Sequence, residues 1–359
     1  MSKMDRRTFI GAAAAAAASP LLARAKDAAE IRAVLLHLGH NMWCDWYPEG
    51  FDLERVRKEF PKSFPDTELR CRDELWKEST DYVAAKGMNM LVIDIGEGLV
   101  FPSHPELAIR GSWTPDRLRA EIARLNALGL EVIPKLNFST THNGWLKQYR
   151  HQLYTPKYYQ VCEDLIRDVC EIFNHPRLFH IGCDEESARH QEQSRRSSFI
   201  LVRRGEFWWH DFFHLIATCE KNGTRPWTWP DFAWDNPEYY DRCPKSVLQC
   251  TWYYDEEHGG FDLATNKTGD LKRLMEFVEL EKRGFDQTPC GTNWVGWVRK
   301  AHKVDADDVI GKLVRFAREN IAPERLKGFM MASWAACDTR ENVDFLKRGV
   351  DLFAATQRT

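Results

Sequence analysis

The stretch TPDRLRAEIARLNALGLEVIPKLNF (residues 114–138) places a helical pattern directly before an apolar run. Leu118, Ile122 and Leu125 recur at helix spacing, and Pro115 stands near the start, where a helix tolerates proline best. The run LEVIPKLNF (130–138) is short and apolar, which is typical of a buried strand. The sequence therefore predicts a helix over 114–131 that leads into a strand.

The same alternation extends along the chain. Helical patterns also cover 158–173 and 306–320, and no glycine-rich phosphate turn follows the first apolar run, as an open doubly wound sheet would require. Repeated strand and helix units favour an α/β fold, a (β/α)8 TIM barrel with its helices outside, in a single domain over 26–359. The runs that predict its strands are IRAVLLHLGH (31–40), MNMLVIDIG (88–96), LEVIPKLNF (130–138), RLFHIGCDE (177–185), RPWTWPDFAW (225–234), SVLQCTWYY (246–254), FDQTPCGTNW (285–294) and GFMMASWAAC (328–337).

Residues 1–25 have the pattern of an export signal peptide. Arg6 and Arg7 precede an apolar, Ala-rich segment over 9–22, and small residues stand at Ala23 and Ala25. The arginine pair is typical of the twin-arginine (Tat) type, which bacteria use to export folded proteins. We expect recognition by the Tat export machinery, cleavage after about Ala25, a periplasmic or secreted mature protein, and no stable membrane insertion after processing.

Charge and cysteine usage narrow the possible partners. Residues 26–359 carry 46 basic and 52 acidic side chains, a formal net charge of −6. Because binding to nucleic-acid phosphates requires basic patches, no nucleic-acid partner is expected. The ten cysteines lack paired zinc-ligand spacing. Cys183, Cys250, Cys290 and Cys337 fall in or beside predicted strands and are expected to be free, buried thiols.

An acidic pair follows the fourth predicted strand, in RLFHIGCDEES (177–187). In a closed barrel the chemistry sits at the carboxyl ends of the strands. Alternation along the strand directs Asp184 into the barrel mouth and Cys183 toward the helices, and Glu185 reaches the mouth only if the backbone turns. Two carboxylates this close should interact, so that one holds a proton near neutral pH, as a general acid requires. From Glu186 onward we expect a solvated helix start.

Aromatic and polar side chains gather at the ends of the other predicted strands. Fourteen tryptophans are many for one chain. The flat face of an aromatic ring suits the C–H face of a sugar, although tryptophan is also a common core residue. The pattern therefore favours a carbohydrate pocket. The residues concerned are Trp43, Asn137, His142, Trp145, Trp229, Trp252, Tyr253, Asp255, Asn293, Trp294 and Trp334.

The sequence HIGCDE (180–185) resembles the His-x-Gly-Gly-Asp-Glu motif that ends the fourth strand in glycoside hydrolase family 20, the β-N-acetylhexosaminidases. Tyr-Tyr-Asp at 253–255 is similar to that family's Tyr-x-Asp, and Thr-Thr-His at 140–142 to its Pro-Gly-His. Residues 104–134 resemble the family segment from the second to the third strand. The resemblance implies a TIM-barrel glycoside hydrolase that acts on β-N-acetylhexosaminides or related glycans with retention, and that needs no metal or cofactor.

The resemblance also implies roles for single residues. In that family the 2-acetamido oxygen of the substrate attacks the anomeric carbon, so that no enzyme nucleophile is needed. Glu185 would protonate the leaving oxygen, and Asp184 would orient the acetamide. Tyr253 would hydrogen-bond the acetamide carbonyl, and Asp255 a sugar hydroxyl. The other residues expected to bind the substrate are Trp229, Trp252, Trp334, His142, His180 and Asn137.

The chain departs from the family pattern at three places. The first strand offers His37 and His40 where the family has an Arg for sugar hydroxyls. After the last strand, Trp334 is followed by Ala336 where the family has Trp-x-Glu. Cys183 replaces the second glycine of the acidic motif. These departures leave open a substrate other than a simple terminal N-acetylglucosamine.

Two alternatives stay open. A metal-dependent hydrolase or isomerase barrel could draw ligands from several strand ends, but His37 and His40, three apart on a predicted strand, should face opposite sides, and no His-x-His occurs. A non-catalytic carbohydrate-binding barrel would keep the fold without turnover, whereas the acidic pair favours an enzyme. The candidate metal ligands are His37, His40, Asp94, Glu97, His142, His180 and Asp184.

Overall fold

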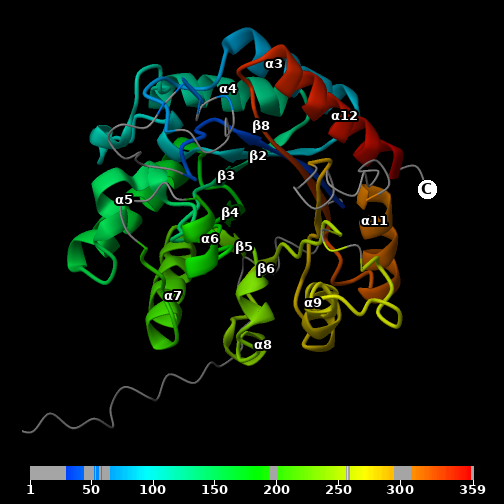
Figure 1. Cartoon of the computed structure of the whole chain (residues 1–359). Helices are drawn as coiled ribbons and strands as arrows, with labels where there is room; N and C mark the ends of the chain where they lie inside the picture. Colours follow the sequence, from blue (N-terminus) through cyan, green and yellow to red (C-terminus); the bar gives the residue numbers. More distant parts are fainter. Residues whose placement is uncertain are drawn as a thin grey trace, which may run out of the picture.

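Parallel strands form the centre of the molecule and helices surround them (Figure 1). The predicted export segment, 1–25, lies outside the described residues and stays a prediction. No helix among the described residues is both long and apolar enough to cross a membrane. The structure, a computed structural model, describes residues 30–43, 52, 54, 55, 58, 65–194, 200–255, 257, 259–294 and 309–356.

Eight strands lie side by side in the order β6-β5-β4-β3-β2-β1-β8-β7. Each paired neighbour is parallel, and each strand falls inside one of the eight predicted runs, so the α/β barrel prediction is confirmed. The strands are β1 (Ile31–His37), β2 (Met90–Asp94), β3 (Glu131–Lys135), β4 (Leu178–His180), β5 (Arg225–Thr228), β6 (Leu248–Gln249), β7 (Cys290–Gly291) and β8 (Gly328–Ala336).

Helices connect the strands on the outside of the ring (Figure 1). The predicted helix of the opening stretch is α4, which begins at Pro115; the hydroxyl of Thr114 accepts the backbone N–H of Arg117 at 3.2 Å and so caps its first turn. The main helices are α3 (Asp73–Ala85), α4 (Pro115–Ala127), α5 (Pro156–Ile172), α6 (Ala188–Ser194), α7 (Glu206–Lys221), α8 (Tyr239–Arg242), α9 (Leu271–Lys282), α11 (Val309–Asn320) and α12 (Arg340–Thr356).

The two end strands of the sheet meet at a weak seam. β6 and β7 have two residues each, and single parallel bridges, Gln249 with Gln287 and Trp252 with Cys290, join their segments. The backbone N–H of Thr288 donates to the Gln249 carbonyl at 2.8 Å. These bridges complete the ring, so that the carboxyl ends of all eight strands surround one mouth.

Apolar side chains form two layers, one on each side of the strands. An inner cluster fills the barrel, with Leu178, Trp227 and Met330 among its members. An outer cluster packs strands against helices, and it includes Ile181 and Cys183, as alternation predicts. The cysteines expected to be free and buried, Cys183, Cys250, Cys290 and Cys337, are so.

The fifth predicted strand is shorter than its apolar run. β5 ends at Thr228, and a 3-10 turn, η5 (Asp231–Trp234), begins directly after Pro230. Proline has no N–H to continue a ladder, so the apolar run leaves the sheet at this point. The consequence is that Asp231 lies at the barrel mouth rather than within a strand.

Candidate active site at the barrel mouth

The acidic pair, Asp184 and Glu185, lies on a strained turn over residues 182–186. β4 ends at His180, and the backbone then takes positive φ at Gly182 (73°), Cys183 (72°) and Glu185 (55°). A Cβ at Gly182 would lie 2.0 Å from the side-chain oxygen of Asn137, so this position requires glycine. The turn brings Glu185 to the mouth, as the sequence analysis requires.

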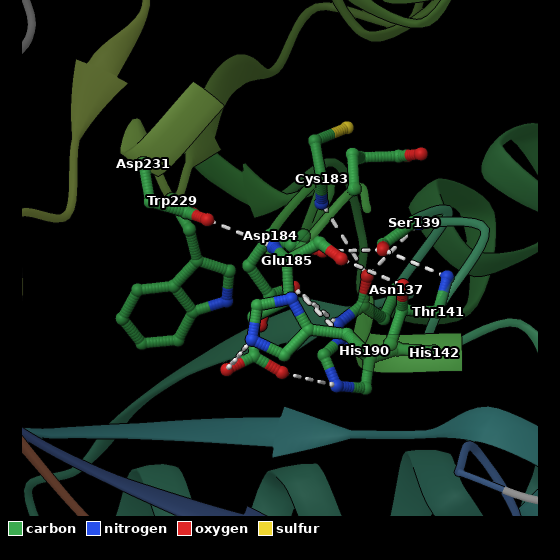
Figure 2. Close-up of polar contacts among 12 residues, drawn as sticks. Asn137, Ser139, Thr141, His142, Cys183, Asp184, Glu185, His190, Trp229 and Asp231 are labelled. Atoms are coloured by element: carbon green, nitrogen blue, oxygen red, sulfur yellow. Dashed lines mark hydrogen bonds and ion pairs between the residues drawn. The ribbon is translucent and has the colours of Figure 1, made fainter. Parts of the chain in front are cut away.

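His142 lies between the two carboxylates (Figure 2). Its Nδ1 is 3.3 Å from Asp184 Oδ1, and its Nε2 is 3.3 Å from Glu185 Oε2. Asn137 Nδ2 also donates to Asp184 Oδ1, at 2.8 Å. His190 of α6, which sequence reasoning missed, has its Nε2 3.6 Å from Glu185 Oε1. His142 and Asn137, expected as substrate ligands, are thus direct partners of the acidic pair.

Proton occupancy in this cluster differs from the expectation. Burial opposes ionisation of Asp184 and Glu185, but the charge and hydrogen bonds of His142 outweigh it and hold the pKa of both carboxyls below their ordinary values. Burial also disfavours a charged His142, yet the two carboxylates raise its pKa to about 10. These pKa directions favour a proton on the intervening imidazole, where the sequence analysis had expected it on one of the carboxyls.

The run Ser139 to His142 anchors the turn on its β3 side. The hydroxyl of Ser139 donates to the carbonyl of Asp184, and the hydroxyl of Thr141 donates to that of Glu185 at 2.7 Å (Figure 2). Thr140 binds the side chain of Glu186, and His142 contacts both members of the acidic pair. Residues 139–142 therefore hold the three acidic residues 184–186. The sequence feature that pointed to this was the similarity of Thr-Thr-His at 140–142 to the family's Pro-Gly-His.

The sequence analysis expected a solvated helix to start at Glu186, but the side chain of this residue is buried. Its side chain is 1% exposed and is ion-paired with Arg203, which is equally buried. Its carboxylate also accepts the hydroxyl of Thr140 at 2.5 Å and the Thr140 backbone N–H at 3.1 Å. The prediction was wrong because the turn directs this side chain toward the helices, where a buried arginine meets it.

Asp231 is a further carboxyl at the site that sequence reasoning missed. Its Oδ2 accepts the backbone N–H of Glu185 at 2.8 Å, so η5 anchors the turn from the opposite side (Figure 2). Burial, and then the nearby charge of Asp184, raise the pKa of Asp231 well above its ordinary value. The sequence feature that could have indicated this position of Asp231 is Trp-Pro-Asp at 229–231, in which the proline ends the strand early.

Below the mouth lies a polar layer made by four residues in register on neighbouring strands, His37, Asp94, Lys135 and His180. Lys135 is fully buried and donates to Asp94. His180 is also fully buried, and its Nδ1 accepts the N–H of Gly182 at 3.1 Å. His180 thus supports the turn from beneath, and its predicted role as a substrate ligand stays a prediction.

Three of the predicted sugar-binding tryptophans line the inner side of the barrel. Trp229 packs on His180, with ring centroids 4.7 Å apart, and on Trp334 at 5.9 Å. Trp252 belongs to the same inner cluster and packs on Tyr254 at 4.9 Å. These residues form an aromatic cluster inside the barrel, in which Trp229 contacts the ring of His180 at the end of β4. Trp145, by contrast, packs in the outer cluster and donates to the Asn137 carbonyl.

Tyr253 and Asp255 face away from the mouth, contrary to expectation. Tyr253 is fully buried in the outer cluster, and its hydroxyl donates to Asp255 Oδ1 at 3.1 Å. Asp255 Oδ1 also accepts the Gly260 N–H at 2.9 Å, which ties down the following loop. The reason is strand alternation: Tyr254, one residue along, belongs to the inner cluster instead.

The proposed metal ligands do not assemble. His37 and His40 were expected to face opposite sides, but β1 ends at His37 and the two rings lie 5.0 Å apart. Asp94 is paired with Lys135, and Glu97 accepts the backbone N–H groups of His40 and Asn41. Within the described ranges, no group of three or more His, Cys, Asp or Glu side chains is placed to hold a metal ion.

The fold and the site together define a class, a TIM barrel with an acidic pair at the carboxyl ends of its strands and a cluster of tryptophans inside the ring. Comparison with models of protein families gives no match, and neither does comparison with curated protein sequences. Solved structures do match, and they include β-N-acetylhexosaminidases described as GH20, that is, glycoside hydrolase family 20.

The matching structures are similar in fold at low sequence identity. The β-N-acetylhexosaminidase from Bacteroides fragilis NCTC 9343 is 11% identical, with a TM-score of 0.55 over 89% of this chain and 65% of that one. The GH20 enzyme from Streptomyces coelicolor A3(2) is 14% identical, with a TM-score of 0.53 over 89% and 63%. Dispersin B is 15% identical, with a TM-score of 0.55 over 92% and 99%. The chain spans less than two thirds of the first two structures, and these similarities show its fold.

Proposed function

We propose that this protein is a retaining glycoside hydrolase that acts on β-N-acetylhexosaminides or related glycans through substrate-assisted catalysis. The observation that carries the proposal is the cluster of Asp184, His142 and Glu185, with both carboxylates 3.3 Å from one imidazole at the barrel mouth. Adjacent carboxylates suit this chemistry, since they need not flank the scissile bond. The fold shared with solved GH20 enzymes and the cluster of tryptophans inside the barrel support it.

In the proposed reaction the acetamido oxygen forms a bond to the anomeric carbon as the bond to the leaving oxygen breaks. Glu185 donates its proton to that oxygen, and Asp184 stabilises the positive charge that develops on the acetamide. Water then opens the cyclic intermediate, gives its hydroxyl to the anomeric carbon and returns a proton to Glu185. Each carboxylate thus has one task, and the substrate supplies the nucleophile.

In the free protein, the proton that Glu185 must donate lies on its neighbour. Glu185 has a lowered pKa, while His142 holds a proton at neutral pH. A sugar that covers the mouth excludes water and favours the neutral form of Glu185. We therefore propose that substrate binding moves the proton from His142 Nε2 to Glu185 Oε2 across the 3.3 Å contact.

The test is hydrolysis of aryl β-glycosides with and without a 2-acetamido group, measured for the wild type, Glu185→Gln and Asp184→Asn. We expect cleavage of acetamido sugars only, a loss of about 100-fold or more in kcat for Glu185→Gln with binding retained, and a similar loss for Asp184→Asn. A thiazoline-type inhibitor should block the wild type. Unimpaired turnover by Glu185→Gln would sink the assignment, and cleavage restricted to sugars without the acetamide would exclude substrate assistance.

A second candidate is a carbohydrate-binding barrel without turnover. The lowered pKa of Glu185 beside His142 favours it, because a carboxyl that stays ionised cannot act as a general acid. The same panel separates the two: this candidate predicts that the wild type binds an N-acetylglucosamine oligomer in calorimetry yet releases no aglycone from any glycoside.

We also propose that the chain is exported as a Tat substrate and works in the periplasm or outside the cell. The arginine pair and the short apolar segment over 9–22 support this proposal.

A further inference from the structure

A buried arginine on the outer side of the barrel contacts the acidic turn. Arg203 precedes α7, and its side chain is 1% exposed. Its Nη2 donates to Glu186 and, at 2.9 Å, to the carbonyl of Phe138, just after β3. Its Nη1 donates to Asp211 Oδ2 of α7 at 3.2 Å. One guanidinium therefore joins the β3 end, the acidic turn and α7.

The partners of Arg203 are themselves fixed. Asp211 Oδ1 accepts the hydroxyl of Tyr159 from α5 at 2.6 Å, and Glu186 is held by Thr140. Breaking a buried ion pair leaves an uncompensated charge in a dry environment. The guanidinium fork is thus an anchor of defined geometry, and a lysine has a single nitrogen for three acceptors that lie in different directions.

This anchor lies directly behind the strained turn. Glu185 has a φ of 55°, and such conformations persist only when the surroundings impose them. Asp231 holds the backbone N–H of Glu185 and Thr141 holds its carbonyl, from opposite sides of the turn. Glu186 is the next residue along, so its ion pair fixes the turn from the helix side.

We propose that Arg203, acting through Glu186, is a positioning residue that holds the Glu185 carboxyl in line with the leaving oxygen. The inference rests on the proposed function. Arg203 lies on the helix side and does not line the mouth, so its effect is on proton transfer and not on sugar binding. Misplacement of a reacting group by about 1 Å can cost about 100-fold in rate.

The experiment compares Arg203→Lys with Arg225→Lys. Arg225 is also buried, donates to the Ser246 carbonyl at 2.5 Å and lies 3.0 Å from Asp286, but it begins β5 at the end of the barrel away from the mouth. Kinetics are measured on 4-methylphenyl and 2,4-dinitrophenyl β-N-acetylglucosaminides. The first aglycone needs a proton to leave, and the second leaves readily as the anion.

For Arg203→Lys we expect kcat to fall about tenfold or more on the 4-methylphenyl substrate and less than about threefold on the dinitrophenyl one, with KM little changed. Thr140→Val, which removes one hydrogen bond to Glu186, should shift the ratio of the two rates in the same direction by less. Arg225→Lys should leave that ratio at the wild-type value. An unchanged ratio in folded Arg203→Lys, or an equal change in Arg225→Lys, overturns the inference.

Hydrogen exchange keeps the inference testable without activity. The N–H of Glu185 donates to Asp231, so its exchange rate reports on the turn. We expect faster exchange of this amide in Arg203→Lys than in Arg225→Lys, and equal rates contradict the inference. A wild type that hydrolyses neither glycoside refutes the proposed function, and the exchange result then judges the Arg203 anchor by itself.

Discussion

At the scale of the residue, one imidazole organises the site. His142 is 3% exposed, contacts both members of the acidic pair, and has its pKa raised to about 10 although burial works against its charge. A buried cation between two carboxylates satisfies all three groups, whereas removal of the imidazole leaves two like charges facing each other. The sequence suggested His142 as a sugar ligand, and the structure makes it a partner of the acidic pair.

This environment predicts a pH dependence of stability. The folded pKa of His142 lies above its ordinary 6.5, so the folded chain binds more protons than the unfolded one between about pH 6.5 and 10. Its stabilising contribution is complete below about pH 6.5 and is lost as pH rises toward 10. Over this range the wild type should lose up to about 1.4 kcal/mol of unfolding free energy per pH unit relative to His142→Gln.

The measurement is urea denaturation of the wild type and His142→Gln at several pH values between about 6.5 and 9.5. His175→Gln is the matched control, because His175 is exposed and lies outside the site. Parallel curves for the wild type and His142→Gln would contradict the raised pKa of His142.

At the scale of the element, the decisive feature is the early end of β4. The strand stops at His180, backbone hydrogen bonds to the neighbouring strands continue to Ile181 and Gly182, and residues 183–186 carry the chemistry on backbone that no ladder fixes. Side chains from the β3 loop, η5 and Arg203 supply that support instead. The alternation argument predicted Cys183 outward and Asp184 inward, and both directions hold although the strand itself is shorter than the apolar run.

Gly182→Ala tests this turn. The added methyl would meet Asn137 Oδ1 at 2.0 Å on backbone with a φ of 73°. Gly87→Ala is the matched control, since φ is 81° there and nothing lies within 4 Å of the added Cβ. We expect a loss of about 1 kcal/mol for Gly87→Ala and about 3 kcal/mol or more for Gly182→Ala in chemical denaturation. Equal losses would show that the turn has room to relax.

At the scale of the whole molecule, the barrel is asymmetric in how firmly its strands are joined. β1 has a ladder of several residues with β2 on one side and with β8 on the other, whereas the β6–β7 seam depends on single bridges. The acidic pair and His142 follow β4 and β3, which are joined by a short pairing as well, since β4 has three residues and pairs with β3 through His180 and Lys135. The geometry of the site therefore depends on the side chains that hold the turn, from Ser139, Thr141 and Asp231, more than on the strand ladder beneath it.

Export is a property of the whole chain and is tested on it. Expression of the full sequence in a bacterium with a Tat system should give periplasmic protein whose mass corresponds to cleavage after about Ala25. Arg6→Lys combined with Arg7→Lys should retain the precursor in the cytoplasm. Periplasmic protein in a strain without Tat components contradicts the proposal, and Lys3→Arg, which keeps the pair, is the control.

The sequence alone determined the α/β barrel, because helical and strand periods and their order are local properties that one chain displays directly. It also determined that Asp184 and Glu185 follow the fourth strand. Only the tertiary structure decided which neighbours they have: His142 between them, Asp231 and Thr141 on their backbone, and Arg203 behind them. It also placed Tyr253 in the outer cluster and His180 beneath the acidic turn. Such contacts join residues up to some 50 positions apart, and the exact residue at which each strand ends sets them, a detail that apolar runs leave open by several residues.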